Sequence, residues 1–117
     1  MVIKELIKSI KINLDLSKEA YKEYLKTNNS YLFAQLIYKY NIETRELLSK
    51  NITTLPCELV ASAQKLIFYY DVWSLKWNSL NDTKLFQLKE PFIFENDYTF
   101  PKDASKAFET FYSEQIK

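Results

Sequence analysis

Four stretches of the sequence repeat apolar side chains at the three- and four-residue spacing that gathers them on one face of a helix. This periodicity predicts an all-α fold, an irregular assembly of four helices at about residues 2–27, 31–50, 56–79 and 101–116. The 117 residues suffice to bury one hydrophobic core but not two. We therefore expect a single helical domain over residues 1–117.

Polar residues and one proline indicate where these helices begin. Asp15 or Ser17 could cap a new helix, so the first helix is expected either to run unbroken or to break near residues 13–17. Ser30 follows a short loop, "TNN", and is expected to cap the second helix. Pro56 suits the first turn of the third helix, because its missing N–H would have no partner there.

The absence of glycine and histidine excludes most catalytic chemistry. Phosphate-binding loops, dinucleotide fingerprints and nucleophile elbows need glycine, and Ser-His-Asp or Cys-His catalysis needs histidine. Cys57 stands alone, so it can neither form an internal disulfide nor hold zinc or an iron–sulfur cluster. We therefore expect no enzyme activity, no metal site and no cofactor.

Carboxylates remain as a possible source of chemistry. Asp15, Glu19 and Glu23 recur at four-residue spacing and could share a helix face that binds a cation. The simpler interpretation is a solvated face on which these carboxylates pair with nearby lysines.

The chain carries no targeting or membrane signal that can be recognised. Its apolar runs are too short to cross a bilayer, and the N-terminal residues "MVIKELIKSIKINL" lack the uninterrupted apolar stretch of a signal peptide. A single cysteine fits a reducing compartment. We expect a cytoplasmic protein with no membrane partner.

Aromatic residues give the strongest indication of a binding surface. Nineteen of the 117 residues are Phe, Tyr or Trp, more rings than so small a domain can bury. Tyr70 and Trp73 continue the apolar stripe of the third helix and are expected in the core. The remaining rings are expected at an interface, because Tyr and Trp dominate binding hot spots. The partner-binding residues predicted on this basis are Tyr69, Trp77, Phe92, Phe94 and Tyr98.

The last three of these residues belong to a segment with a different pattern. At residues 91–100, apolar and aromatic residues flank Asn96-Asp97, which indicates a short hairpin or a pair of extended segments. The alternative to an interface is that this segment folds back over its own helices.

Lysines along the first helix support a second hypothesis, nucleic-acid binding. Residues 1–50 carry nine basic and six acidic side chains, while the whole chain has a net charge of only +1. This is far short of a dense basic patch, and the lysines could instead solubilise the helix. The possible nucleic-acid contacts are Lys4, Lys8, Lys11, Lys18 and Lys22.

The pattern "LPCEL … YYDVWSLKW … FIF … TFPKDASKAF", within residues 55–108, resembles small all-helical bacterial proteins of the host–phage conflict or toxin–immunity type. The resemblance includes no catalytic motif. It implies a non-catalytic protein that binds another protein, as an immunity or inhibitor protein or an accessory subunit. The implied partner is a toxin, a nuclease, a defence component or a second copy of the chain.

Overall fold

Over the residues that the structure describes, the protein is an all-α assembly of four helices, as the periodicity predicted. The computed structural model describes residues 2–83 and 99–116, and within these ranges there is no strand. Residues 91–98 of the predicted hairpin lie outside the described residues, while Thr99 and Phe100 lead into the last helix without regular structure. The helices are α1 (Ile3–Lys26), α2 (Tyr31–Lys50), α3 (Cys57–Thr83), α4 (Lys102–Phe111) and a π-helical turn, η1 (Tyr112–Ile116).

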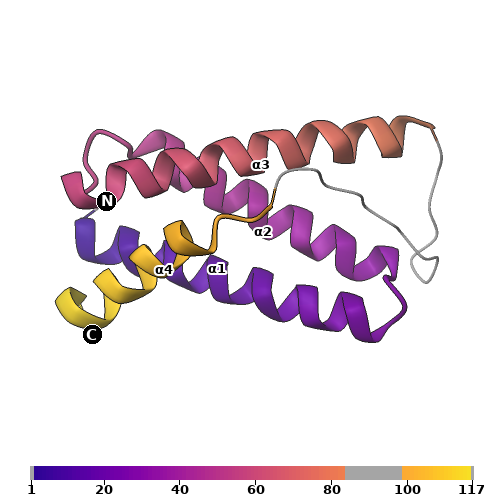
Figure 1. Cartoon of the computed structure of the whole chain (residues 1–117), viewed down its shortest axis with the longest axis horizontal. Helices are drawn as coiled ribbons and strands as arrows, with labels where there is room; N and C mark the ends of the chain where they lie inside the picture. Colours follow the sequence, from indigo (N-terminus) through magenta and orange to yellow (C-terminus); the bar gives the residue numbers. More distant parts are fainter. Residues whose placement is uncertain (1, 84–98, 117) are drawn as a thin grey trace.

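The three long helices run alongside one another in an elongated body of 42 × 24 × 24 Å. Helix α2 packs against both α1 and α3, and α3 follows one long edge of the molecule (Figure 1). The short α4 packs on α3 and α1 near the end where α1 begins and η1 finishes. Consequently α4 covers only part of the length of the bundle.

Helix α1 is continuous, so the alternative of a break near residues 13–17 was wrong. Neither candidate capping residue caps a helix. The Lys11 ammonium contacts the Asp15 carboxylate at 2.6 Å across one turn of the same helix. The Ser17 hydroxyl donates a hydrogen bond to Asn41 Oδ1 on α2, at 3.0 Å. Both side chains therefore have partners that are compatible with an unbroken helix.

The turn between α1 and α2 shows how a chain without glycine ends a helix. Asn28 and Asn29 both have φ of 58°, in the left-handed region that glycine usually occupies. The Asn29 N–H donates to the Tyr24 carbonyl at 2.8 Å, which is the six-to-one bond of a Schellman motif. Asparagine is the side chain that best tolerates this conformation after glycine.

Replacing Asn28 tests this turn. Asn28→Ala is expected to lower the free energy of unfolding by about 1 kcal/mol, because a Cβ-bearing residue without a helpful polar side chain is disfavoured there. Asn28→Gly is the matched control and should be at least as stable as the parent protein. Urea unfolding of the three proteins measures the difference, and equal stability of the two variants would contradict the left-handed turn.

Ser30 lies at the N-cap position of α2 with an extended backbone, as predicted, but its side chain makes no capping hydrogen bond. The reason is local. The Ser30 Oγ atom contacts the Thr27 hydroxyl at 3.0 Å, and that hydroxyl also lies 2.8 Å from the Glu23 carbonyl. The expected cap is thus replaced by a contact within the turn.

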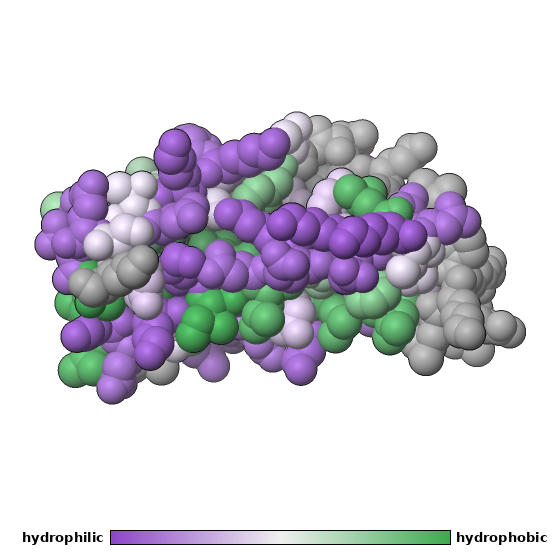
Figure 2. Space-filling view, turned by 90° about the horizontal axis from the view of Figure 1, so that it is seen from below, coloured by the Kyte–Doolittle hydropathy of each residue, from purple (hydrophilic) through white to green (hydrophobic). Residues whose placement is uncertain are grey.

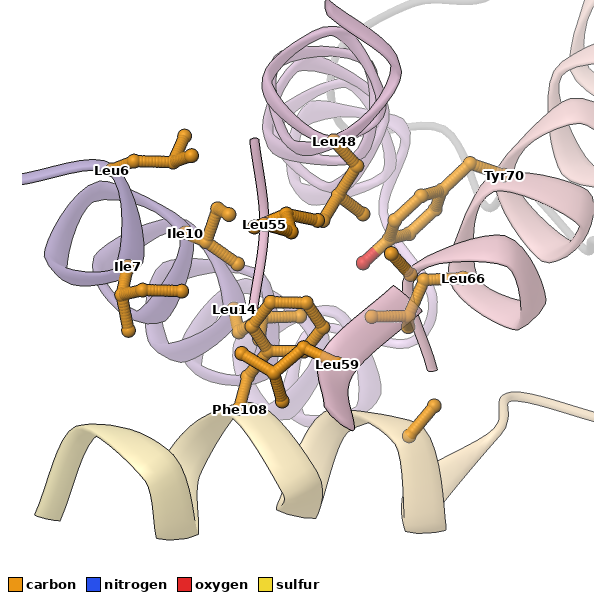
Figure 3. Packing of buried hydrophobic residues seen from close by; sticks show 12 residues of the cluster. Leu6, Ile7, Ile10, Leu14, Leu48, Leu55, Leu59, Leu66, Tyr70 and Phe108 are labelled. Carbon is orange, nitrogen blue, oxygen red and sulfur yellow. The ribbon is translucent and has the colours of Figure 1, made fainter. Parts of the chain in front are cut away.

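One part of the core is aliphatic and is built from all four helices. Figure 3 shows side chains converging from α1, α2, α3 and α4 on a common centre. Phe108 points from α4 into this centre and is fully buried. The helical residues of this cluster continue the one-face spacing of their own helices, and Leu55 joins them from the loop between α2 and α3. Its fully buried members include Leu6, Ile7, Ile10, Leu48, Ala63, Leu66 and Phe108.

Polar side chains buried in this interior are paired. The Thr44 hydroxyl donates to the Tyr40 carbonyl at 2.7 Å. Burial raises the pKa of Tyr70 above its ordinary value, so this side chain stays protonated and remains a donor. Within the described residues, no buried side-chain nitrogen or oxygen lacks a partner.

Candidate functional site

A second core cluster, at the other end of the bundle, is aromatic. The rings of Tyr31 and Tyr38 on α2 stack with those of Trp73 and Trp77 on α3. Trp77 lies 4.7 Å from Tyr38 and 5.7 Å from Tyr31 between ring centroids, with interplanar angles of 10° and 4°. Trp73 lies 5.5 Å from Trp77 and 5.8 Å from Tyr38. These centroid distances fall in the range where offset ring pairs attract one another.

Trp73 and Tyr70 are buried, as the stripe predicted, but the predicted partial exposure of Trp77 was wrong. The Trp77 side chain is only 7 % exposed. It continues the same helix face as Trp73, and the tyrosines of α2 supply the aromatic wall against which it packs. Further along, Asn81 holds the end of this cluster, because its Oδ1 accepts from the Tyr31 hydroxyl and its Nδ2 donates to the Trp77 carbonyl.

The other predicted partner-binding residues divide into two groups. Tyr69 is half-buried and contacts both core clusters. Its ring meets Phe100 edge to face, with centroids 5.1 Å apart. Phe92, Phe94 and Tyr98 lie outside the described residues, so their assignment stays a prediction. The structure therefore brings Tyr69 and Trp77 into the interior side of α3.

The opposite side of α3 presents apolar side chains to solvent. Leu75 is 72 % exposed, more than any other large hydrophobic side chain of the described residues, and Phe68 is 54 % exposed. Ala61 is exposed too, and Val72 is half-buried between them. Helical spacing aligns these residues along the solvent side, and we call this surface the α3 outer face. It comprises Ala61, Gln64, Phe68, Val72, Leu75 and Ser79.

None of the six residues of the α3 outer face is charged, and two exposed charges beside it, Asp71 and Lys65, are paired. Asp71 accepts a hydrogen bond from Arg45 Nε of α2 at 2.9 Å, and this contact raises the pKa of Arg45. Lys65 pairs with Asp103 of α4 at 2.9 Å, and the hydrogen bond from Lys65 lowers the pKa of Asp103. Both ion pairs tie α3 to a neighbouring helix. An approaching apolar partner would therefore meet no uncompensated charge at Asp71 or Lys65.

The lysines of α1 lie on the far side of the molecule. Figure 2, which views the molecule from the side of α1 and α4, shows a long band of hydrophilic residues with hydrophobic surface beside it. Lys11, Lys18 and Lys22 each contact a carboxylate, of Asp15, Glu109 and Glu19 respectively. Lys4 and Lys8 are exposed and make no ion pair with a described residue. The predicted basic ridge is thus largely neutralised along its length.

The carboxylates of α1 pair with lysines as the simpler interpretation predicted. Glu23 contacts Lys26 at 3.6 Å, and Glu19 contacts Lys22 at 3.3 Å. In the part of the chain that the structure describes, no three His, Cys, Asp or Glu residues are placed so that they could hold a metal ion. None of the described helices combines the length and the apolar character needed to span a bilayer.

The α3 outer face was missed by the sequence analysis, although the sequence contains a signal for it. Phe68, Val72 and Leu75 recur at four- and three-residue spacing, just as the core residues of the same helix do. Helix α3 therefore has apolar residues on both sides.

Comparison of the chain with protein-family models, with curated proteins and with solved structures found no match. The geometry of the described residues is therefore the basis on which a function can be argued.

Proposed function

We propose that this protein is a non-catalytic binding protein that docks onto another protein through the α3 outer face. The observation that carries the proposal is the exposure of Leu75 and Phe68, 72 % and 54 %, on a surface without charged residues. Exposed aromatic and aliphatic side chains on a helix are typical anchors for a partner's groove or helix. The residue types that most catalytic sites require, glycine and histidine, are missing from the whole sequence.

Other exposed apolar residues support this choice by contrast. Ile12, Leu16 and Leu25 of α1 are 47 %, 40 % and 55 % exposed, but the same helix also carries exposed charges at Asp15, Glu19 and Lys22. Apolar side chains scattered singly among charges are normal on any protein surface. On the α3 outer face the apolar side chains succeed one another without an intervening charge. This continuity distinguishes a docking surface from ordinary exposure.

The nucleic-acid alternative has weaker support. Three of its five lysines contact carboxylates, so they have little excess charge for phosphate groups. Lys4 and Lys8 alone would supply two phosphate contacts. Affinity for nucleic acid would then depend only weakly on salt, in contrast to the steep dependence of dedicated binders.

We propose that the protein, by docking in this way, acts as an immunity or inhibitor protein or as an accessory subunit. The resemblance of residues 55–108 to proteins of conflict loci is the ground for this choice, and these residues include the entire α3 outer face. A protein that covers a toxin or a nuclease needs a rigid surface and no chemistry of its own. A long helix packed on two neighbours provides such a surface.

Capture from a lysate of the source organism tests the proposal. The parent chain is expected to capture its partner protein, whereas the Leu75→Glu and Phe68→Glu variants should not. Each substitution should weaken the binding free energy for this partner by about 2 kcal/mol or more. Both substitutions place a charge on an exposed apolar surface, so they should change the stability of the isolated chain by less than about 0.5 kcal/mol. Quantitative mass spectrometry of the captured material is the measurement.

Leu16→Glu is the matched control, since it introduces the same charge at an exposed leucine on α1. It should capture the partner as the parent protein does. If Leu16→Glu abolishes capture while Leu75→Glu and Phe68→Glu retain it, the docking surface lies on α1 and the proposal is wrong.

A further inference from the structure

We infer that Arg45 determines which partner the α3 outer face accepts: by neutralising Asp71, it admits a partner whose contacting surface is apolar and uncharged. The inference rests on the proposed function, because it names the chemistry of the partner at the same face. Asp71 precedes Leu75 by four residues, so the two side chains are neighbours on the surface of α3. A partner that covers Leu75 therefore also approaches the Asp71 carboxylate.

Arg45 holds this carboxylate from the neighbouring helix. Its Nε donates to Asp71 Oδ1 at 2.9 Å, and its Nη1 donates to Glu46 Oε1 at 3.3 Å. Among the described residues, Arg45 is the only cation that forms an ion pair with Asp71. Glu46 has a second cation, because the Lys50 ammonium lies 3.7 Å from its Oε2. Loss of Arg45 would therefore leave Asp71, but not Glu46, without a counter-ion.

Arginine suits this position better than lysine. The chain has a single arginine beside fifteen lysines. A planar guanidinium presents its N–H donors in a fixed fork and can hold two carboxylates at once, whereas lysine has a compact ammonium on a flexible stem. The Asp71 side chain is 50 % exposed and that of Arg45 is 32 % exposed. The carboxylate is thus the more accessible member of the pair to a partner that lies on α3.

The ion pair matters more for docking than for folding. In the free chain an exposed carboxylate is solvated, so its ion pair contributes little to stability. An apolar partner that covers Leu75 removes water from the adjoining carboxylate as well, and a carboxylate without a counter-ion resists this loss of water. Arg45 therefore acts on binding through Asp71, as a positioning residue that need not touch the partner.

A double-mutant cycle between Arg45 and Asp71 tests the inference. The parent chain, Arg45→Gln, Asp71→Asn and the double variant are immobilised, and each is exposed to a dilution series of lysate from the source organism. Quantitative mass spectrometry follows the protein that the parent chain retains. Arg45→Gln should need at least about tenfold more lysate for half-maximal capture, because it leaves a carboxylate unpaired beside Leu75.

Removal of the carboxylate should repair this loss. The double variant is expected to regain capture to within about threefold of the parent chain, because neither charge of the pair remains. Asp71→Asn alone should also capture as the parent chain does, since Arg45 keeps Glu46 as its counter-ion.

Two further readouts distinguish this role from a structural one. The melting temperature of Arg45→Gln should stay within about 5 °C of the parent value, because exposed ion pairs contribute little to stability. Its loss of capture should shrink when salt is raised from about 0.05 M to about 0.5 M, because salt screens an exposed carboxylate. A distortion of the packing between α2 and α3 would be relieved neither by salt nor by Asp71→Asn.

The possible outcomes decide the inference and keep it separate from the proposed function. Unchanged capture by Arg45→Gln overturns the inference, and so does a double variant that captures no better than Arg45→Gln. Tighter capture by Arg45→Gln would show that the partner presents a cation to Asp71, which contradicts an uncharged partner surface. If Leu75→Glu retains capture, the proposed docking itself is wrong. If Leu75→Glu loses capture while Arg45→Gln keeps it, the docking stands and only the role of Arg45 is overturned.

Discussion

Trp77→Ala is expected to lower the free energy of unfolding by about 3–5 kcal/mol, the usual cost of deleting a large buried aromatic ring. The side chain is 7 % exposed and its ring stacks with those of Tyr31, Tyr38 and Trp73. Its removal would leave these rings without their common neighbour and open a cavity between α2 and α3. Collapse of the surrounding rings would recover part of the loss, which gives the range.

Phe68→Ala is the matched control for Trp77→Ala, because it also removes an aromatic ring from α3. The Phe68 ring is 54 % exposed, so its loss should cost far less stability. Urea unfolding monitored by circular dichroism measures both variants. If Trp77→Ala proves no more destabilising than Phe68→Ala, the stacked cluster does not form in solution.

Phe108→Ala is expected to release α4 from the bundle, also at a cost of about 3–5 kcal/mol. Phe108 is fully buried and inserts among residues of α1, α2 and α3 (Figure 3). Helix α4 has ten residues, too few to be stable in water without tertiary packing. The ion pairs Lys65–Asp103 and Lys18–Glu109 are exposed and screened by solvent, so they cannot hold α4 in place by themselves.

Hydrogen exchange resolves the effect of Phe108→Ala along the chain. The amides of α4 should exchange much faster than in the parent protein, while the amides of α2 at the aromatic end retain more protection. Phe111→Ala serves as the control, since Phe111 is only half-buried and its loss should leave α4 docked. Unchanged protection of α4 in Phe108→Ala would mean that another contact anchors this helix.

The helices could be predicted because the apolar periodicity of each one is local information. Leu59, Ala63, Leu66, Tyr70 and Trp73 share one face by spacing alone, and all are buried. Local capping signals were less reliable. Asp15 and Ser17 are good capping residues. In the continuous helix, however, Asp15 pairs with Lys11, and Ser17 donates a hydrogen bond to Asn41. The second of these partners comes from another helix, which the spacing along α1 does not reveal.

The burial of Trp77 could not be predicted from α3 alone. A large ring at the end of an apolar stripe is covered only if another element supplies a matching surface. Here Tyr31 and Tyr38 of α2 supply it, and their position opposite Trp77 depends on how the two helices pack. Counting the rings predicted correctly that some aromatic side chains stay exposed, as Tyr21 and Phe68 do. The count did not say which ones.

The identity of the exposed residues was, however, encoded in the spacing of α3. Phe68 and Leu75 fall on the side opposite Tyr70 and Trp73, so one helix has two apolar stripes. The packing decides which stripe faces inward: α2 contributes rings around Trp73, and α4 contributes Phe108 to the cluster that contains Tyr70. This is why the binding surface is assigned to Phe68 and Leu75 rather than to Trp77.

Site-specific photo-cross-linking in living cells tests most directly that the α3 outer face is the binding surface. A benzophenone amino acid is placed at position 75 on α3 and, in a separate protein, at position 16 on α1; both are exposed leucines. After irradiation, we expect covalent adducts, with a second copy or a foreign protein, from position 75 and none above background from position 16. Adducts from position 16 without adducts from position 75 would contradict this expectation.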